Sequence, residues 1–289
     1  DGALTLAAPA KVNLDLLVTG RRPDGYHELD SLVVFTELAD RLTLEPAPEL
    51  TVEAGGPFAA ALPPGRGNIV TRAATLLAAE AGRSPGVRLR LEKNLPVAAG
   101  IGGGSADAAA TLRGLARLWR LGLADDRLFE LALELGADVP ACLAACPLRM
   151  RGIGERHDPV RGQPEQPQLL VNPGVPVPTG EVFRRLGELR SEGRPEPFPA
   201  RPSVVRLAVW LQKSRNDLEA PARELASEVD AVLTALGGLP GCLVARMSGS
   251  GATCYGLFAD PAGLDAAAAR LRQLHPDWWV AATTAPGRP

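Results

Sequence analysis

Hydrophobic and polar positions alternate in two stretches of the N-terminal half. In 12-VNLDLLV-18 the apolar residues Val12, Leu14 and Leu16 alternate with polar ones, and 87-VRLRLE-92 repeats this pattern. Side chains on a strand point alternately to its two faces, so a period of two is typical of a strand with one buried face. We therefore predict half-buried strands at both places.

Helical patterns fill much of the remaining N-terminal half. The stretch 68-NIVTRAATLLAAEAG-82 has helical composition and ends on a glycine suited to a cap. Residues 105–120 open with Ser105 and Asp107 and continue in alanine and leucine, and 125-DDRLFELALEL-135 follows. These patterns predict three helices.

The chain changes character near residue 161. Polar, proline-bearing stretches at 161–167 and 191–202 predict linkers or loops. Beyond residue 202 we predict two helices and three strands, namely helices 220–236 and 262–274 and strands 242–247, 253–258 and 278–284. This alternation predicts a small α+β lobe, and the whole chain is expected to be an α+β protein of two lobes.

Composition and charge narrow the class of protein. A chain of 289 residues with 46% hydrophobic and 22% charged residues is ordinary for a globular protein and long enough for two cores. A formal charge of -2 gives no electrostatic case for binding nucleic acid. With no apolar run of membrane-spanning length and no leader pattern, we expect a cytoplasmic protein without a membrane partner. The oligomeric state stays open, as does removal of a leader before residue 1, which is not methionine.

Cysteine and lysine usage adds two points. Four cysteines are too sparse for a disulfide framework and form no metal-binding motif. Of 31 basic residues only Lys11, Lys93 and Lys213 are lysines. Lysine is a compact charge that can approach deprotonation when buried, so a lysine in place of an arginine suggests a specific role. For Lys213, next to Ser214 and Arg215, chance is the simpler explanation.

A glycine cluster stands directly before the helix predicted at 105–120. Gly100, Gly102, Gly103 and Gly104 fall within five residues. The chain has no Gly-Lys pair for a Walker A loop, and Ser105 stands where the dinucleotide fingerprint needs its third glycine, which argues against a flavin or nicotinamide enzyme. Glycines let backbone N–H groups approach an anion closely, and a helix adds its positive end. We therefore predict a phosphate-binding loop rather than a flexible turn.

Two further clusters carry candidate chemistry. The stretch 247-MSGSGATCYGLF-258 lies between two predicted strands, where its glycines suit either a hairpin turn or a binding loop. Residues 8–32 gather charged, amide and aromatic side chains around a predicted turn at 23-PDG-25.

In this order and spacing, the three clusters resemble the GHMP kinase superfamily, whose phosphate loop reads P-x-x-x-G-(I/L)-G-G-G-S/A-S. The segments PAKVNL, GRRPDGYHELDSLV, LPVAAGIGGGSADAA, LGADVPACL, NPGVPVPTGEVF, NDLE and MSGSGATCYGLF are similar to those of its members that act on 4-diphosphocytidyl-2-C-methyl-D-erythritol. The resemblance extends from about residue 6 to 259, and RRPDGYHEL is its most specific segment. It departs at Ala98 and Ala99, and at Ala106, where a second serine is common.

The resemblance implies a GHMP kinase fold with an N-terminal ATP-binding lobe at 1–160 and a C-terminal ferredoxin-like lobe at 161–289. It implies transfer of the γ-phosphate of ATP, with Mg²⁺, to the 2-hydroxyl of that substrate, in the methylerythritol phosphate route to isoprenoid precursors. Asp138 falls on the catalytic aspartate, and Lys11 on a lysine that favours the ionised aspartate and a developing alkoxide. Ser105 is either a Mg²⁺ ligand or a helix cap.

The resemblance also implies two sets of binding residues. Those on the ATP side are Pro96, Gly100, Gly102, Gly103, Gly104, Ser105, Asn68 and Lys93. Those on the substrate side are Asn13, Tyr26, His27, Thr179 and Phe183, with Tyr26 and Phe183 expected to sandwich the cytosine. Without the resemblance, a phenylalanine such as Phe183 is more often a core residue, and a histidine such as His27 more often forms a hydrogen bond in a turn.

Two alternatives remain at this point. A homoserine or mevalonate kinase of the same superfamily has no need for a cytidine clamp, so the Tyr26 and Phe183 pair argues against it. A catalytically silent nucleotide-binding module would keep the glycines but not need Lys11 and Asp138, and both are present.

Overall fold

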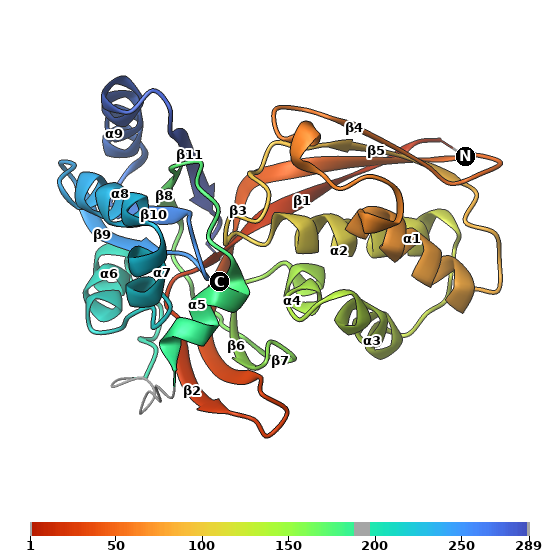
Figure 1. Ribbon diagram of the computed structural model, residues 1–289, viewed down its shortest axis with the longest axis horizontal. Coiled ribbons are helices and arrows are strands. Elements are labelled where there is room, and N and C mark those ends of the chain that lie inside the picture. The colour runs from red at the N-terminus through yellow and green to blue at the C-terminus, as the bar shows by residue number, and fades with distance from the viewer. Residues whose placement is uncertain (1, 188–196, 288–289) are drawn as a thin grey trace. The chain divides into compact units, whose positions relative to one another are not determined.

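The computed structural model describes residues 2–187 and 197–287 (Figure 1). They form two compact units that interleave along the chain. The first unit comprises the N-terminal residues up to 10 together with 38–97 and 102–145, and the second comprises 11–37, 98–101 and the residues from 146 onward. Each unit is thus assembled from separate stretches, and the lobe boundary expected at residue 160 stays a prediction.

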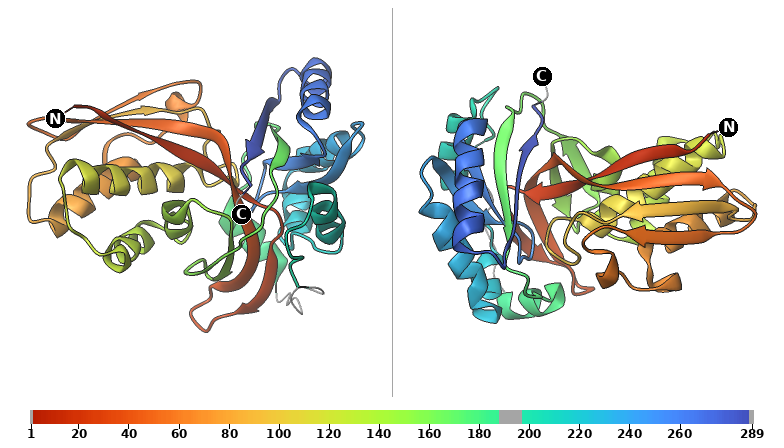
Figure 2. Two further views of the ribbon diagram at one scale, coloured as in Figure 1. Left: turned by 180° about the vertical axis from the view of Figure 1, so that it is seen from behind. Right: turned by 90° about the horizontal axis from the view of Figure 1, so that it is seen from above.

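The first unit is a sheet with helices on one of its sides (Figures 1 and 2). Its strands are β4 (Thr51–Gly55), β5 (Val87–Glu92) and the parts of β1 (Leu4–Asn13) and β3 (His27–Pro46) up to residue 10 and from residue 38. Its helices are α1 (Ile69–Glu80), α2 (Gly103–Leu118), α3 (Asp125–Leu135) and α4 (Val139–Ala144). Helix α2 packs closely on the sheet, because a Cβ on Gly114 would lie 2.7 Å from Leu44 Cδ1.

Local sequence explains these elements well. The alternation in β5 is confirmed, since its apolar residues are buried and its charged ones exposed. The helix predicted at 68–82 is α1, whose N-cap Asn68 accepts a hydrogen bond from Val70 N. The helix predicted at 105–120 is α2, which begins two residues earlier than expected, at Gly103.

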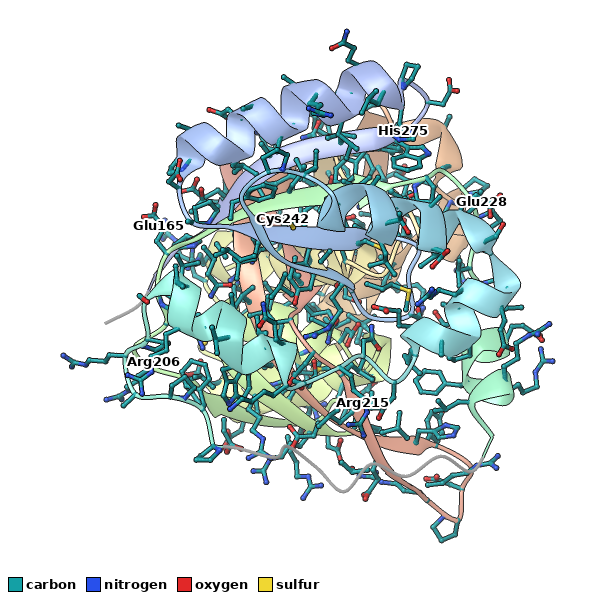
Figure 3. All side chains as sticks on the ribbon, turned by 90° about the vertical axis from the view of Figure 1, so that its left-hand side faces the viewer. Glu165, Arg206, Arg215, Glu228, Cys242 and His275 are labelled. Atoms are coloured by element: carbon teal, nitrogen blue, oxygen red, sulfur yellow. The ribbon has the colours of Figure 1, made fainter. Side chains whose placement is uncertain are left out.

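The second unit contains a four-stranded antiparallel sheet in the order β11 (Trp279–Ala285), β8 (Gln166–Asn172), β10 (Cys254–Phe258), β9 (Cys242–Met247). Helices α6 (Val204–Gln212), α8 (Ser227–Gly237) and α9 (Pro261–Leu274) lie in front of this sheet in Figure 3. The unit also holds α5 (Thr179–Leu186), α7 (Glu219–Leu225) and the strands β2 (Leu17–Arg21), β6 (Leu148–Gly152) and β7 (Arg156–Pro159). Its buried core includes Val171, Val232, Phe258 and Leu271.

Three predictions of elements need correction. The strand expected at 12–18 is interrupted, because β1 ends at Asn13 and β2 begins at Leu17, and the polar residues between apolar ones are buried. Asp15 can be buried because its carboxylate accepts hydrogen bonds from Leu32 N at 2.7 Å and Ser214 Oγ at 2.7 Å.

The helix expected at 220–236 is two helices, α7 and α8, separated at Ala226, whose backbone is extended (φ -144°, ψ 101°). The loop expected at 161–167 gives way to β8 at Gln166. Gln166 and Gln168 are buried in this strand and hydrogen-bond to one another. Their polar character therefore does not mean that they lie in a surface loop. The other predicted loop covers residues 191–202, of which 191–196 lie outside the described part of the chain.

Two long strands were not predicted. Residues Asp30 to Thr36 of β3 and all of β8 are buried, so neither stretch shows the alternation of a half-buried strand. Residues 40–45 of β3 do alternate between buried and more exposed positions. No helix in the described part of the chain has the length and apolarity needed to cross a membrane.

Candidate functional site

Two glycine-bearing loops are hydrogen-bonded to one another in the second unit. Ser248 Oγ donates to Gly100 O at 2.9 Å, and Thr253 N donates to Ala99 O at 3.1 Å. A Cβ on Gly100, whose φ is +77°, would lie 2.5 Å from the carbonyl oxygen of Ser248, and one on Gly249 would lie 2.9 Å from the carbonyl oxygen of Gly100. Contact between the loops therefore requires glycine at both positions.

Lys11 and Asn13 lie beside these loops at the end of β1. Lys11 donates from its backbone N to Ile101 O at 2.9 Å and from Nζ to Asn13 Oδ1 at 3.1 Å. Asn13 N donates to Ser248 Oγ at 3.0 Å, and Asn13 Nδ2 donates to Ser31 Oγ at 2.7 Å. The fold thus brings two predicted site residues, both buried, to the first glycine loop.

In the first unit, α2 begins without a side chain that caps its first backbone N–H groups. Gly102 is its N-cap, with φ +63°, and has no side chain to accept from the N–H groups of the first turn. Gly104 is exposed, and a Cβ there would have only Ile69 Cγ2 within 4 Å, at 3.9 Å. Ser105 is half-buried, and Pro96 is buried near the entrance of the loop. These features suit the binding of a phosphate.

Lys93 lies in a buried ionic cluster close to that helix start. Its Nζ donates to Asp40 Oδ2 at 2.5 Å and to Asp107 Oδ2 at 2.6 Å. All three side chains are almost fully buried. Burial raises the pKa of Asp107 to about 7, against the lowering effect of the Lys93 charge. Asp107 Oδ1 is buried without a hydrogen-bond partner.

Asn68 and Asp138 both stand at helix starts in the first unit. Asn68 is buried and its side chain caps α1, as described above. Asp138 is half-buried and directly precedes α4, without a capping hydrogen bond from its side chain. Its catalytic role stays a prediction, as does nucleotide binding by Asn68 and Lys93.

The predicted substrate residues cluster partly in the second unit. The rings of His27 and Phe183 are stacked, with centroids 4.9 Å apart and planes 24° from parallel. Tyr26 is 62% exposed at the hairpin turn, where Gly25 has φ +93° as the predicted turn requires. Thr179 Oγ1 is 2.8 Å from Ser250 Oγ of the second glycine loop. Phe183 also packs against the core, and its part in a cytosine sandwich with Tyr26 stays a prediction.

One ring nitrogen of His27 has a hydrogen-bond partner and the other has none. Burial lowers its pKa, and a hydrogen bond with the backbone of Gly187 acts against that. His27 Nε2 is buried without a partner, so the bond to Gly187 belongs to Nδ1. A neutral imidazole whose Nδ1–H donates to a carbonyl has an acceptor at Nε2.

Sequence reasoning missed several residues that hold the site together. Ser248 and Thr253 bond the first glycine loop, and Asn216 Nδ2 donates to Met247 O and Gly249 O, both at 2.8 Å. The NDLE segment that contains Asn216 is indicated only by the resemblance. Asp40 gives no local signal and Asp107 gives only that of a helix start, because each acquires its partner only in the fold.

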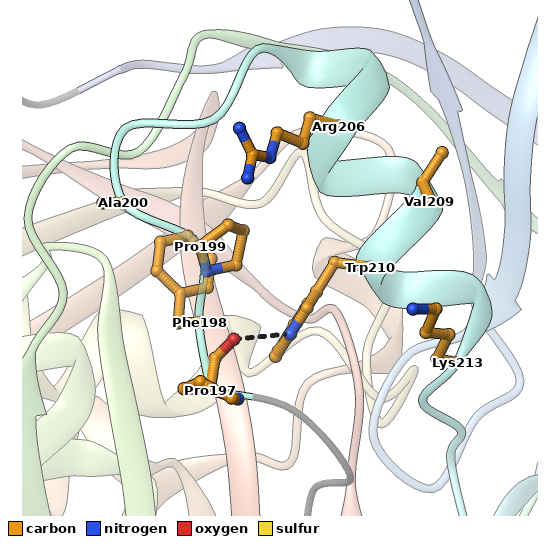
Figure 4. Close-up of a pocket in the computed structure, with 8 residues that line it drawn as sticks. All are labelled: Pro197, Phe198, Pro199, Ala200, Arg206, Val209, Trp210 and Lys213. Carbon is orange, nitrogen blue, oxygen red and sulfur yellow. Dashed lines mark hydrogen bonds between the residues drawn. The ribbon is translucent and has the colours of Figure 1, made fainter.

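A pocket of about 520 Å³ in the second unit contains none of the predicted site residues (Figure 4). It lies between Phe198 and α6, and Trp210 Nε1 donates across its edge to Pro197 O at 3.0 Å. Its lining residues are Pro197, Phe198, Pro199, Ala200, Arg206, Val209, Trp210 and Lys213. Nor does the described part of the chain contain a group of three or more His, Cys, Asp or Glu residues that could hold a metal ion.

Comparison with known proteins gives a consistent result. The family model for the GHMP kinases N terminal domain matches residues 68–145, and that for the GHMP kinases C terminal domain matches residues 202–277. The chain is 51% identical to the 4-diphosphocytidyl-2-C-methyl-D-erythritol kinase of Dinoroseobacter shibae, over 96% of this chain and 93% of that one. It is 52% identical to the enzyme of the same name from Rhodospirillum rubrum, over 96% and 90%.

A crystal structure of 4-(cytidine 5'-diphospho)-2C-methyl-D-erythritol kinase has the same fold, with a TM-score of 0.79 and 39% identity over 98% of this chain and 100% of that one. Both the domain models and the near-complete coverage agree with the resemblance of the loops. The chain belongs to the GHMP kinase family.

Proposed function

We propose that this chain transfers the γ-phosphate of ATP to the 2-hydroxyl of 4-diphosphocytidyl-2-C-methyl-D-erythritol, in the methylerythritol phosphate route to isoprenoid precursors. The observation that carries the proposal is identity of 51–52% over 96% of the chain with kinases named for this substrate. Its partners are then two small molecules, with no nucleic acid. The proposal includes a cytoplasmic location, because the reaction consumes ATP.

The start of α2 supports the ATP side. A helix that begins at a glycine N-cap leaves its first N–H groups and positive end for an anion. An exposed Gly104 leaves room for a phosphate group to approach the backbone. The roles of Pro96, Gly100, Gly102, Gly103 and Ser105 in this loop are part of the proposal.

The His27 and Phe183 pair supports the cytidine side. Stacking between a base and an aromatic ring contributes ~1 to 3 kcal/mol. The exposed ring of Tyr26 is available to stack on the base, while Asn13 and Thr179 would contact the substrate through their polar groups.

The proposed mechanism uses Asp138 and Lys11. Asp138 accepts the proton of the attacking hydroxyl, and the ammonium of Lys11 favours the ionised aspartate and the developing alkoxide. Because Lys11 is fixed through Asn13 and Ile101, its charge stays in place as the reaction proceeds. Mg²⁺ in such sites is held largely by phosphate oxygens and neutralises their charge; the half-buried Ser105 hydroxyl would be its ligand from this chain.

A coupled assay of ADP release tests the proposal. 4-Diphosphocytidyl-2-C-methyl-D-erythritol, homoserine and mevalonate are offered separately with ATP and Mg²⁺. Turnover with the cytidylated substrate alone is expected, and ³¹P NMR should show a new phosphate monoester on it. Turnover with homoserine or mevalonate instead would assign another kinase of the family. ATP binding without turnover on any of the three would indicate a silent nucleotide-binding module.

A further inference from the structure

The buried cluster of Lys93, Asp40 and Asp107 joins three elements of the first unit. Asp40 comes from β3, Lys93 follows β5, and Asp107 lies in the second turn of α2. The lysine bridges the two carboxylates, at 2.5 Å and 2.6 Å. Since buried ions are tolerated only with good geometry and further hydrogen bonds, the cluster constrains all three elements.

The same cluster holds the entrance of the phosphate loop. Asp40 Oδ1 accepts from Asn94 N at 2.6 Å and from Leu95 N at 2.8 Å. The backbone of Lys93 is fixed as well, because its N donates to Gly55 O at 2.8 Å and its O accepts from Phe58 N at 3.2 Å. The chain therefore enters the loop from a rigid point.

The loop ends at the same cluster. Asp107 holds the start of α2 through its bond to Lys93. A Cβ on Gly103, in the first turn of α2, would lie 3.1 Å from Lys93 Nζ and 3.4 Å from Leu95 Cβ. The ammonium of Lys93 is thus packed against the helix start. This packing favours glycine at position 103, in addition to any contact with phosphate.

We infer that the Lys93–Asp40–Asp107 cluster positions the phosphate loop, so that Lys93 acts on nucleotide binding through the loop and not by touching ATP with its ammonium. The ammonium is 1% exposed and already bonded to two carboxylates, which leaves it no solvent-facing surface for a phosphate. Lys93 and Asp107 are positioning residues in this account. The inference rests on the proposed ATP-dependent function.

The test compares substitutions at two members of the cluster. Asp107→Leu removes the bond to Lys93, whereas Asp107→Asn keeps an oxygen toward Lys93 and can turn its amide NH₂ to the side where Oδ1 has no partner. Leu115→Ala, in the buried face of the same helix, lowers stability away from the cluster. Melting temperature, the Kd of ATP by calorimetry, and both KM values are measured on each purified protein.

We expect Asp107→Leu and Lys93→Met each to weaken ATP binding by ~10- to 100-fold, the scale on which outer-shell partners and small misplacements act. KM for the cytidylated substrate should change little. Asp107→Asn should stay within a few-fold of the unmodified protein, and Leu115→Ala should lower the melting temperature without changing the Kd. The double variant Lys93→Met/Asp107→Leu should be no worse than either single one, because the two residues act as a unit.

Two results would overturn the inference. If Lys93→Met weakens ATP binding but Asp107→Leu does not, the ammonium touches the nucleotide directly. If both lower only the melting temperature, the cluster is structural.

Should those variants fail to fold, Lys93→Arg keeps the charge but needs more room beside Gly103, so it should weaken ATP binding several-fold; an unchanged Kd refutes the positioning role. ATP binding is measured without the second substrate, so this test remains valid even if the unmodified protein proves inactive on 4-diphosphocytidyl-2-C-methyl-D-erythritol.

Discussion

Single residues in this protein combine a structural and a chemical role. Asn13 uses its backbone N and both side-chain polar atoms in contacts with Ser248, Ser31 and Lys11. Phe183 packs on the core and stacks on His27. Substitution of such a residue changes stability and activity together, so a test has to separate the two.

Asp138 offers the simplest test at this scale. Asp138→Asn keeps the shape of the side chain and removes the proton acceptor, so kcat should fall by ~10²-fold or more. The Kd of ATP should stay near its starting value, because the change leaves the phosphate loop intact. Steady-state kinetics and calorimetry on one preparation decide the matter, and near-normal turnover would remove Asp138 from the mechanism.

Phe183→Ala separates a cytidine contact from core packing. Loss of stacking worth ~1 to 3 kcal/mol raises KM for the cytidylated substrate by roughly 5- to 150-fold, with KM for ATP little changed. A core role alone predicts a lower melting temperature and an unaltered KM among the molecules that remain folded. Both KM values and the melting temperature are to be measured together.

His27 should titrate below the ordinary histidine range. Burial lowers its pKa from 6.5, and the charge of Arg21 acts in the same direction. Because the folded state then binds fewer protons than the unfolded state, its contribution to stability is present above pH 6.5 and is lost as pH falls through the lowered pKa. NMR titration, with His27→Gln to assign one of three histidines, measures this; a pKa at or above 6.5 would contradict it.

At the scale of elements, the two glycine loops depend on each other. Gly100 lies close to the backbone of Ser248, and Gly249 lies close to that of Gly100. Asn216 holds the second loop through two carbonyl groups. Taken alone, the stretch 247–258 suited a hairpin turn, and β9 and β10 do form an antiparallel pair around it. The fold adds the contact with the first loop.

Gly100→Ala and Gly104→Ala form a matched pair. Gly100→Ala introduces a Cβ 2.5 Å from a carbonyl oxygen at a positive φ, and strained backbone of this kind costs about 1–3 kcal/mol, so the melting temperature should fall. Gly104→Ala has room and lies in a helix, so stability should rise by ~0.5–1 kcal/mol while ATP binding weakens. Thermal unfolding and calorimetry measure both. An unchanged Kd in Gly104→Ala would show that no phosphate lies at this turn.

At the scale of the whole molecule, each compact unit draws on distant stretches of chain. The carbonyl of Leu14 accepts from Tyr255 OH at 2.6 Å and from Arg246 Nη1 at 3.1 Å, and Val18 N donates to Asp217 Oδ2 at 2.7 Å. Residues 11–37 therefore complete their unit with partners that come after residue 160.

A fragment of residues 1–160 should consequently fail to fold alone, because residues 11–37 and 98–101 would lose these partners. Circular dichroism and the dispersion of amide NMR signals measure the outcome. Co-expression with residues 161–289 serves as the control and should restore folded protein. A fragment that gives a dispersed spectrum by itself would instead support an independent lobe with a boundary at residue 160.

The sequence by itself determined the elements whose signal is local and the family to which the loops point. The alternation in 87–92, the cap and period of 68–82 and the helix at 262–274 all depend on neighbours a few positions apart, and each of these elements is present. The glycine cluster before a helix likewise predicted where α2 begins to within two residues.

Only the tertiary structure decided what the polar residues of the site contact. Lys93 and Asp40 are 53 positions apart, and Ser248 and Gly100 are 148 apart, so no local period records either contact. Strand β8 and residues 30–36 of β3, buried on both faces, also lack the alternation that would reveal them. Burial and partners are properties of the folded chain, because they depend on which distant segments meet. The sequence could therefore indicate Lys93 as a site residue, but only the fold shows that its ammonium is bonded to two carboxylates.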